Sequence, residues 1–170
     1  MKELLTLCTI VLLSFCVQAQ KKESQDESKK VNYIYEATYL DDFKMGNPDL
    51  VLKVQEMHKH IISKNYKMAG NYLANDVVFA LEDGSRLEGK EKCMKFMIEA
   101  YSSISIEDYS VAVNLAVTGN NGDEWVLLWD NAKIVSEDGT TARFNWMETF
   151  QFENNKIIFM NQFSKPRNLN

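Results

Sequence analysis

The stretch FNWMETFQF, residues 144–152, alternates in the way that a half-buried β-strand does. One face of this strand carries Phe144, Trp146, Glu148, Phe150 and Phe152. An ionised carboxylate among aromatic rings costs free energy unless a partner satisfies it. The functional interpretation therefore centres on Glu148, which is a structural tether, a ligand handle or an acid–base group.

The period-two pattern of this strand extends over the whole second half of the chain, from Ile104 onward. Three dipeptides that tolerate positive φ interrupt the pattern: Asn121-Gly122, Asp138-Gly139 and Asn154-Asn155. These turns predict four antiparallel strands, over residues 104–118, 124–136, 140–152 and 156–163.

The first half of the chain has helical spacing instead. Asn47 as N-cap and Pro48 at the first helical position predict the start of a helix whose apolar stripe includes His58. A shorter helix over 66–73, a strand over 76–81 and a helix from Lys90 to about Tyr101 follow. The prediction is an α+β domain with three N-terminal helices packed on a strongly curved antiparallel meander.

If the turns at 138–139 and 121–122 contain two residues each, Trp129 pairs with Glu148 and Ala112, Asn114 and Ala116 share their face. Small side chains beside large aromatic ones predict a pocket around Glu148. Its predicted lining is Asn114, Trp125, Leu127, Trp129, Phe144, Trp146, Phe150, Met160 and Gln162. The alternative is a filled core in which alanine accommodates tryptophan.

The opposite face of the predicted sheet is also apolar. It would carry Val111, Val113, Leu115, Val117, Val126, Leu128 and Ile134. A solvated sheet face normally alternates with polar residues, so this face predicts a homodimer surface.

The N-terminus has the pattern of a signal peptide. Lys2 precedes an apolar run over 4–17, and small residues before Gln20 give a cleavage site. We expect a signal peptide at 1–19, a flexible linker at 20–32, an N-terminal arm at 33–46 and a domain at 47–165, exported to the periplasm or secreted. The alternative is a lipoprotein anchored to the membrane at Cys16, although Phe15 fits that signal poorly.

Composition excludes several classes of protein. The net charge is −5, and the 19 Lys and Arg residues are scattered, so no nucleic-acid partner is expected. No glycine-rich phosphate loop, nucleophile motif or metal-ligand spacing appears, so neither a cofactor nor a metal is predicted. Cys93 is the one cysteine beyond the signal and is expected to be buried in a helix.

Two segments carry a resemblance to a known superfamily. These are VQEMHKHIISKNYKMAGNYLANDVVFALEDGSRLEGKEKC over 54–93 and FNWMETFQFENNKIIFMNQF over 144–163. Their order and spacing resemble the nuclear-transport-factor-2-like (SnoaL-like, ketosteroid-isomerase-like) superfamily. The resemblance implies a cone-shaped, cystatin-like α+β barrel. It leaves function open, because this scaffold carries isomerases, cyclases, dehydratases, hydrolases and non-catalytic binders.

Alignment with the isomerase branch places its base at Leu81, its tyrosine donor at Met57 and its pocket acid at Glu148. Leu81 cannot accept a proton and Met57 cannot donate a hydrogen bond, so the ketosteroid isomerase mechanism is not expected. The interpretation favoured by the sequence is a non-catalytic domain that binds a small apolar or amphipathic molecule.

Two alternatives remain open. His58 and Glu148 would form an acid–base pair in an isomerase, dehydratase or hydrolase. A filled core would instead leave a pure dimerisation or interaction domain. The separation of His58 and Glu148, and the presence of a cavity beside them, discriminate among these possibilities.

Overall fold

The computed structural model describes residues 34–35 and 43–167. The chain divides into two compact units, Met1–Glu36 and Ala37–Asn170, and the second contains every described helix and strand. The predicted signal peptide, linker and Cys16 lie outside the described residues. In the described part of the chain, no helix combines the length and apolar character needed to cross a membrane.

The second unit contains helices, a seven-stranded sheet and short connections. Its first half comprises β1 (Phe43–Met45), α2 (Pro48–Ile62), α3 (Tyr66–Ala69), the 3₁₀ helix η1 (Gly70–Tyr72), β2 (Leu73–Ala80), β3 (Arg86–Glu88) and α4 (Lys90–Tyr101). Four long strands complete it: β4 (Ile104–Gly119), β5 (Glu124–Ser136), β6 (Thr141–Glu153) and β7 (Lys156–Arg167).

The predicted helix starts are confirmed. The Asn47 side chain accepts a hydrogen bond of 3.0 Å from the backbone N–H of Asp49, and Pro48 is the first residue of α2. Gly89 adopts a φ of 93° immediately before α4, a conformation that costs glycine little.

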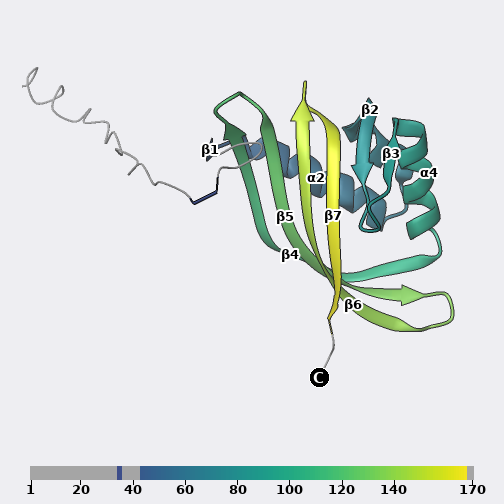
Figure 1. The fold of residues 1–170 in the computed structure, drawn as a ribbon. Helices are drawn as coiled ribbons and strands as arrows, with labels where there is room; N and C mark the ends of the chain where they lie inside the picture. The colour runs from purple at the N-terminus through teal and green to yellow at the C-terminus, as the bar shows by residue number, and fades with distance from the viewer. Residues whose placement is uncertain (1–33, 36–42, 168–170) are drawn as a thin grey trace, which may run out of the picture. The chain divides into compact units, whose positions relative to one another are not determined.

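The sheet has the order β1-β4-β5-β6-β7-β2-β3 (Figure 1). The α+β class and the four-stranded antiparallel meander are confirmed. The predicted strand before the third helix is also present, as β2, but the sequence analysis did not predict its neighbour: β2 pairs in parallel with β7, which adds a parallel edge to the antiparallel meander. Local sequence patterns do not report which distant strands become neighbours, and the three-residue strands β1 and β3 were not predicted.

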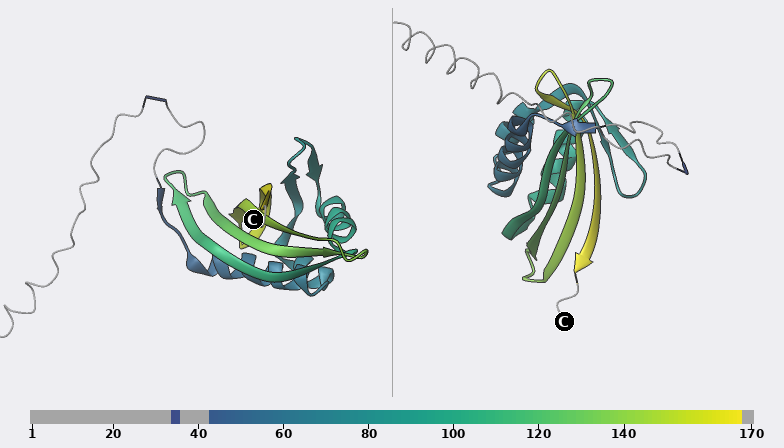
Figure 2. Two further views of the ribbon diagram at one scale, coloured as in Figure 1. Left: turned by 90° about the horizontal axis from the view of Figure 1, so that it is seen from below. Right: turned by 90° about the vertical axis from the view of Figure 1, so that its left-hand side faces the viewer.

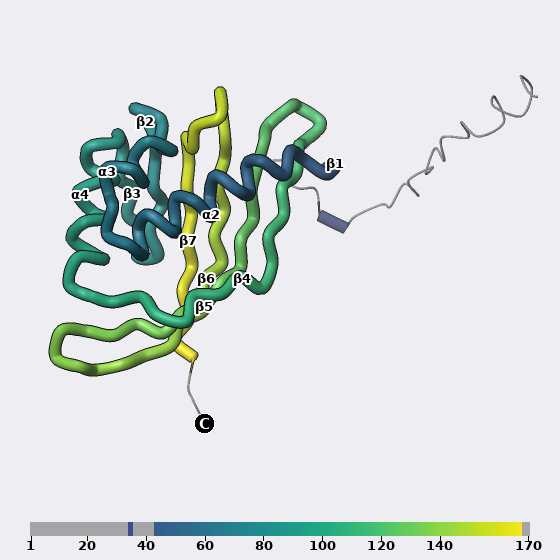
Figure 3. The backbone as a smooth tube through the Cα atoms, turned by 180° about the vertical axis from the view of Figure 1, so that it is seen from behind, coloured from purple at the N-terminus to yellow at the C-terminus, as the bar shows by residue number. Residues whose placement is uncertain are grey.

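Helix α2 crosses one face of the sheet, and the long strands are bent (Figures 2 and 3). The hydrophobic core lies between α2 and the sheet. Leu50, Val54 and Met57 of α2 are at most 1% exposed, and they belong to the same cluster as the strand residues Val126, Leu128, Phe150 and Ile157. Cys93 is buried on α4, as predicted.

The two-residue turn predicted between β5 and β6 is wrong. Val135 pairs with Thr141, and the backbone N–H of Ser136 donates to the carbonyl of Thr140, so the loop contains three residues. Gly139, with a φ of 82°, is the last of them, as in a three-residue hairpin with a glycine bulge. Glu148 therefore faces Leu128 rather than Trp129.

The turn between β4 and β5 is also one residue longer than predicted. Gly119 and Asp123 are joined by a backbone hydrogen bond, and Gly122 has a φ of 90°. The predicted faces of β5 are consequently exchanged: Val126 and Leu128 lie in the core, whereas Trp129 is 43% exposed. The inward face of β6 is as predicted, since Phe150 and Phe152 are buried.

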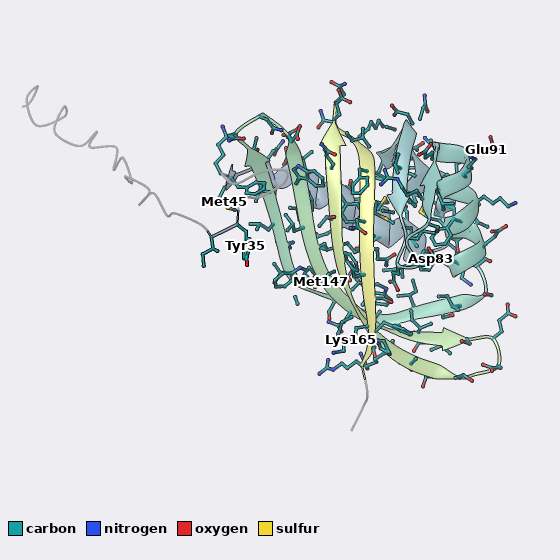
Figure 4. The ribbon with its side chains drawn as sticks, in the orientation of Figure 1. Tyr35, Met45, Asp83, Glu91, Met147 and Lys165 are labelled. Atoms are coloured by element: carbon teal, nitrogen blue, oxygen red, sulfur yellow. The ribbon has the colours of Figure 1, made fainter. Side chains whose placement is uncertain are left out.

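The outer face of the sheet carries a row of exposed apolar side chains at one level. Val113, Trp129, Met147 and Phe163 are successive register partners on β4, β5, β6 and β7, and each is at least 36% exposed. Figure 4 shows Met147 on this face. We call these four residues the outer row.

The corrected register makes a prediction for two adjacent leucines. Leu128→Ala should lower the free energy of unfolding by about 2–5 kcal/mol, because Leu128 is fully buried. Leu127→Ala, on the partly exposed face, should cost less than about 1.5 kcal/mol. Urea unfolding followed by tryptophan fluorescence measures both, and a larger loss for Leu127→Ala would contradict the register.

Candidate functional site

A pocket lies among α2, α4 and the strands β4 to β7. Its walls are mostly apolar, with Met57, Phe96, Met97 and Ile106 among them. Its polar groups are His58, Tyr101, Tyr109, Asp130, Glu148 and Gln162. The volume open to the centres of water-sized molecules is about 60 Å³. This space suits a few waters or part of a small organic molecule.

The structure brings only some of the predicted pocket residues together. His58, Glu148, Trp146, Met160 and Gln162 line the pocket. Trp125, Leu127 and Trp129 do not, because the corrected register puts them on the outer face.

The remaining predicted pocket residues are also displaced from it. Asn114 borders a separate groove beside the start of α2. Phe144 stacks on Trp146 with ring centroids 5.8 Å apart and does not reach the pocket. Phe150 is fully buried and contacts the His58 ring edge-on at 5.9 Å. The apolar walls therefore come largely from helix residues that the sequence analysis did not include.

His58 and Glu148 meet at the polar end of the pocket. The Nε2 atom of His58 lies 3.2 Å from Oε2 of Glu148, and both side chains are nearly buried. The contact does not have hydrogen-bond geometry, because Glu148 Oε2 has no hydrogen-bond partner. Both atoms therefore retain hydrogen-bonding capacity for a bound molecule.

Tyr109 connects His58 to a second buried carboxylate, Asp130. The Tyr109 hydroxyl lies 2.8 Å from His58 Nδ1 and donates to Asp130 Oδ2 at 2.7 Å. Asp130 is 5% exposed, and its other oxygen, Oδ1, has no hydrogen-bond partner. The sequence analysis missed Asp130 because the predicted register put it outside, although one aspartate in the apolar run WVLLWD was an available signal.

Tyr109 reaches the pocket because β4 is irregular beside it. The register with β5 shifts between Glu107 and Ser110, and Asp108 adopts a φ of 48°. Arg143 of β6 binds the Asp108 carboxylate at 2.7 Å. A β-bulge of this kind redirects a side chain, and here it directs the Tyr109 side chain into the pocket.

Burial controls the protonation of the three central groups. It raises the pKa of Glu148 well above its ordinary value, and the Asp130 charge raises it further. Burial also raises the pKa of Asp130 to about 6, although the hydrogen bond from Tyr109 opposes this. Burial lowers the pKa of His58 to about 4. Because only Asp130 receives a hydrogen bond, Asp130 is the more readily ionised of the two carboxylates, and Glu148 is the one that holds its proton more tightly.

Tyr101 and Gln162 complete the polar end. Gln162 on β7 is the register partner of Glu148. Burial, followed by the Glu148 charge, raises the pKa of Tyr101 to about 12, while a hydrogen bond with Gln162 opposes the shift. Tyr101 is therefore neutral at physiological pH and contributes a hydroxyl group, not a charge.

The central groups are also close enough to hold a small cation. One atom each from His58, Asp130 and Glu148 lies within 4.8 Å of the others. They come from α2, β5 and β6, so spacing along the chain could not indicate the cluster. Because Nδ1 of His58 and Oδ2 of Asp130 are already joined through Tyr109, the described arrangement is a hydrogen-bonded acid–base cluster.

Comparison with known proteins gives structural likenesses only. No family model matches the chain, and no curated protein matches it. An LEH-like epoxide hydrolase from M. tuberculosis superposes with a TM-score of 0.56 and 13% identity, over 69% of this chain and 83% of that one.

Two further structures are similar. A Bacillus subtilis protein provisionally named an isomerase has a TM-score of 0.57 and 12% identity, over 71% of this chain and 90% of that one. A protein provisionally named a SnoaL-like polyketide cyclase, from Shewanella putrefaciens, has a TM-score of 0.55 and 10% identity, over 69% of this chain and 80% of that one. At such identities the likeness concerns architecture. The chain has the nuclear-transport-factor-2-like fold that its sequence resembles.

Proposed function

We propose that the protein is an acid–base catalyst that moves a proton on a small, mainly apolar molecule carrying one polar group, as an isomerase or a dehydratase does. The observation that carries the proposal is the separation of 3.2 Å between His58 Nε2 and Glu148 Oε2 at the polar end of an apolar pocket. This geometry favours the catalytic alternative over binding without turnover.

The two groups have complementary proton states. Burial keeps Glu148 protonated, so it is the proton donor. Burial keeps His58 neutral, so one ring nitrogen is a proton acceptor. A buried acid and base whose environments set opposite roles are typical of acid–base sites.

The short distance between His58 and Glu148 limits the kinds of reaction that the pair can catalyse. A base and an acid 3.2 Å apart reach neighbouring positions on one side of a substrate. His58 would remove a proton from carbon while Glu148 protonates a second atom. The result is a shifted double bond, or loss of a hydroxyl group as water. The proposed reaction does not extend to the hydrolysis that the acid–base interpretation of the sequence also left open.

The pocket walls define the substrate body. Met57, Phe96, Met97 and Ile106 offer contacts to an apolar group, while Gln162 and Tyr101 lie beside the acid. Burying apolar surface supplies binding energy of about 25 cal/mol per Å². The neighbours in structure include proteins named for isomerase, cyclase and epoxide hydrolase activity, so this scaffold accommodates chemistry on small molecules.

Deuterium exchange from D2O into the α position of 4-phenyl-2-butanone, followed by NMR, tests proton abstraction. The wild-type protein should accelerate exchange, and His58→Gln and Glu148→Gln should each lower the rate by about 10²–10⁴-fold. Matched controls are His60→Gln on the same helix and Glu153→Gln at the end of the same strand, since neither residue lines the pocket. These controls should retain the wild-type rate.

Two results would overturn the catalytic proposal. One is saturable binding of the ketone, seen as chemical-shift changes, without any acceleration of exchange by the wild-type protein. That result would restore the interpretation as a non-catalytic binding domain. The other is wild-type exchange that survives in both pocket variants.

The protonated state of Glu148 predicts a pH dependence of stability. A carboxyl whose pKa is raised by folding binds its proton more tightly in the folded state, so stability falls as pH rises from its unfolded pKa towards its folded one. Asp130 and His58 oppose one another between about pH 4 and 6, so above pH 6.5 Glu148 dominates within this cluster. The free energy of unfolding should therefore fall with rising pH above pH 6.5, and Glu148→Gln should remove this slope. Urea unfolding between pH 6.5 and 8.5 measures the slope, and equal slopes in the two proteins would contradict a protonated Glu148.

We also propose that the protein forms a homodimer through the outer face of the sheet. The outer row supports this, because four exposed apolar side chains adjoin one another across four strands. The surface differs from the predicted one, since Val126 and Leu128 belong to the core.

Analytical ultracentrifugation tests the dimer. The wild-type protein should sediment as a dimer, and Phe163→Glu should shift it to monomer by placing a charge in the interface. Ile98→Glu, an exposed apolar residue on α4, is the control and should leave the dimer intact. A monomeric wild-type protein at 100 μM would contradict the proposal.

A further inference from the structure

We propose that Asp130, acting through Tyr109, fixes His58 in the tautomer that presents a bare Nε2 to the pocket, and stores the proton that His58 accepts. This assigns a proton relay of three side chains, in which Tyr109 and Asp130 are positioning residues. The storage step deepens the proposed function and rests on it. The tautomer follows from hydrogen-bond geometry alone.

The tautomer follows from counting protons along the chain of contacts. The Tyr109 hydroxyl has one proton and two partners, Asp130 Oδ2 at 2.7 Å and His58 Nδ1 at 2.8 Å. An ionised carboxylate only accepts, so the hydroxyl proton points to Asp130. The hydroxyl oxygen must then accept from Nδ1–H. A neutral imidazole has one N–H, so Nε2 carries a lone pair.

The remaining contact agrees with this assignment. Nε2 lies 3.2 Å from Glu148 Oε2, where a bare nitrogen facing an ionised carboxylate would place two acceptors against each other. A protonated Glu148 removes the conflict. Three other titratable groups face His58 and Asp130: Glu148 from β6, Tyr109 from β4 and Tyr101 at the end of α4. The charge of Glu82 acts on Tyr101.

Proton uptake can then proceed without charging the histidine. As Nε2 takes a proton from substrate, the Nδ1 proton passes to the Tyr109 oxygen and the Tyr109 proton passes to Asp130 Oδ2. His58 ends neutral with its proton on Nε2, Tyr109 stays neutral, and Asp130 becomes a carboxylic acid. The negative charge leaves Asp130, and a matching charge appears on Glu148 when it protonates the substrate.

The same contacts restore the resting state. Nε2–H returns its proton to the Glu148 carboxylate 3.2 Å away, the Tyr109 proton passes back to Nδ1, and the Asp130 proton passes back to Tyr109. The relay matches the burial of the groups. Charging buried His58, whose pKa is about 4, is unfavourable, whereas Asp130 has a pKa of about 6, closer to neutral pH.

Nitrogen-15 NMR of the imidazole tests the tautomer without any substrate. The chain has two histidines, so His60→Gln leaves the His58 resonances alone in the spectrum. In this background at pH 7, with EDTA present, Nδ1 should be protonated and Nε2 unprotonated. Asp130→Leu removes the acceptor of the Tyr109 proton and leaves His58 Nδ1 as the remaining partner of the hydroxyl, so the proton should turn to Nδ1 and His58 should carry its own proton on Nε2.

The outcomes of this measurement are decisive. An Nε2–H tautomer or an imidazolium in the Asp130-containing protein would overturn the proposal, as would an unchanged tautomer in Asp130→Leu. Because no turnover is needed, the result stands even if the exchange reaction proposed above fails. Circular dichroism and the Tm of each variant establish that it is folded.

The pH profile of the exchange reaction tests the storage step. The wild-type rate should rise with pH along an acidic limb whose apparent pKa lies near 6, that of Asp130, because only the ionised carboxylate can take up the proton. Tyr109→Phe, which leaves Asp130 in place but breaks the relay, should lower the rate at pH 7 at least tenfold and remove that inflection. Tyr66→Phe, which removes a tyrosine hydroxyl outside the pocket lining, is the control. A Tyr109→Phe profile identical to wild type would show that Asp130 acts directly and would overturn the relay.

Discussion

The burial of Glu148 is the constraint around which this domain is organised. A carboxyl group on the inner face of β6 cannot be left both charged and unpartnered, so folding has to hold it protonated or supply a partner. Burial raises the pKa of Glu148 well above its ordinary value, which favours the protonated form, and the fold places His58 against it. A second carboxylate, Asp130, is then tolerated nearby because Tyr109 donates to it. Neutral and ionised acids are thus separated by one imidazole ring.

The hydrophobic core around the pocket holds the two acids and the histidine in place. Helix α2 supplies His58 from the same face that supplies Met57 and Val54 to the core, so the histidine is as rigidly placed as its neighbours. The four long strands supply the other groups from four different positions along the chain. Buried polar atoms without partners cost stability, and two of them, Asp130 Oδ1 and Glu148 Oε2, belong to residues of this pocket, as is typical of a site prepared for a ligand.

The sequence was informative wherever a signal was local. Asn47, Pro48 and Gly89 mark helix starts through backbone geometry that involves only their neighbours, and the alternation of FNWMETFQF identified the inward face of β6. Glu148 and His58 could be proposed for this reason. The four long strands were likewise identified by their own pattern.

Pairing between strands could not be predicted in the same way. The dipeptide Asp138-Gly139 fits a two-residue turn and the end of a three-residue loop equally well, and the difference of one residue exchanged the faces of β5. Trp129 was thereby assigned to the pocket and Asp130 to solvent. Tyr109 was missed because a bulge inverts the alternation of β4 beside Asp108, which the residue types do not indicate. The parallel contact of β2 with β7 depends on long-range packing.

The three-residue loop after β5 has an evolutionary consequence. Surface loops ordinarily tolerate gain or loss of a residue with little effect. Here the length of residues 137–139 determines which side chains of β5 lie opposite Glu148. A related chain that lost one of these residues would keep its pocket only if the alternation of β5 changed with it. Loop length and strand pattern should therefore vary together among relatives, so that a short surface connection is inherited as part of the site.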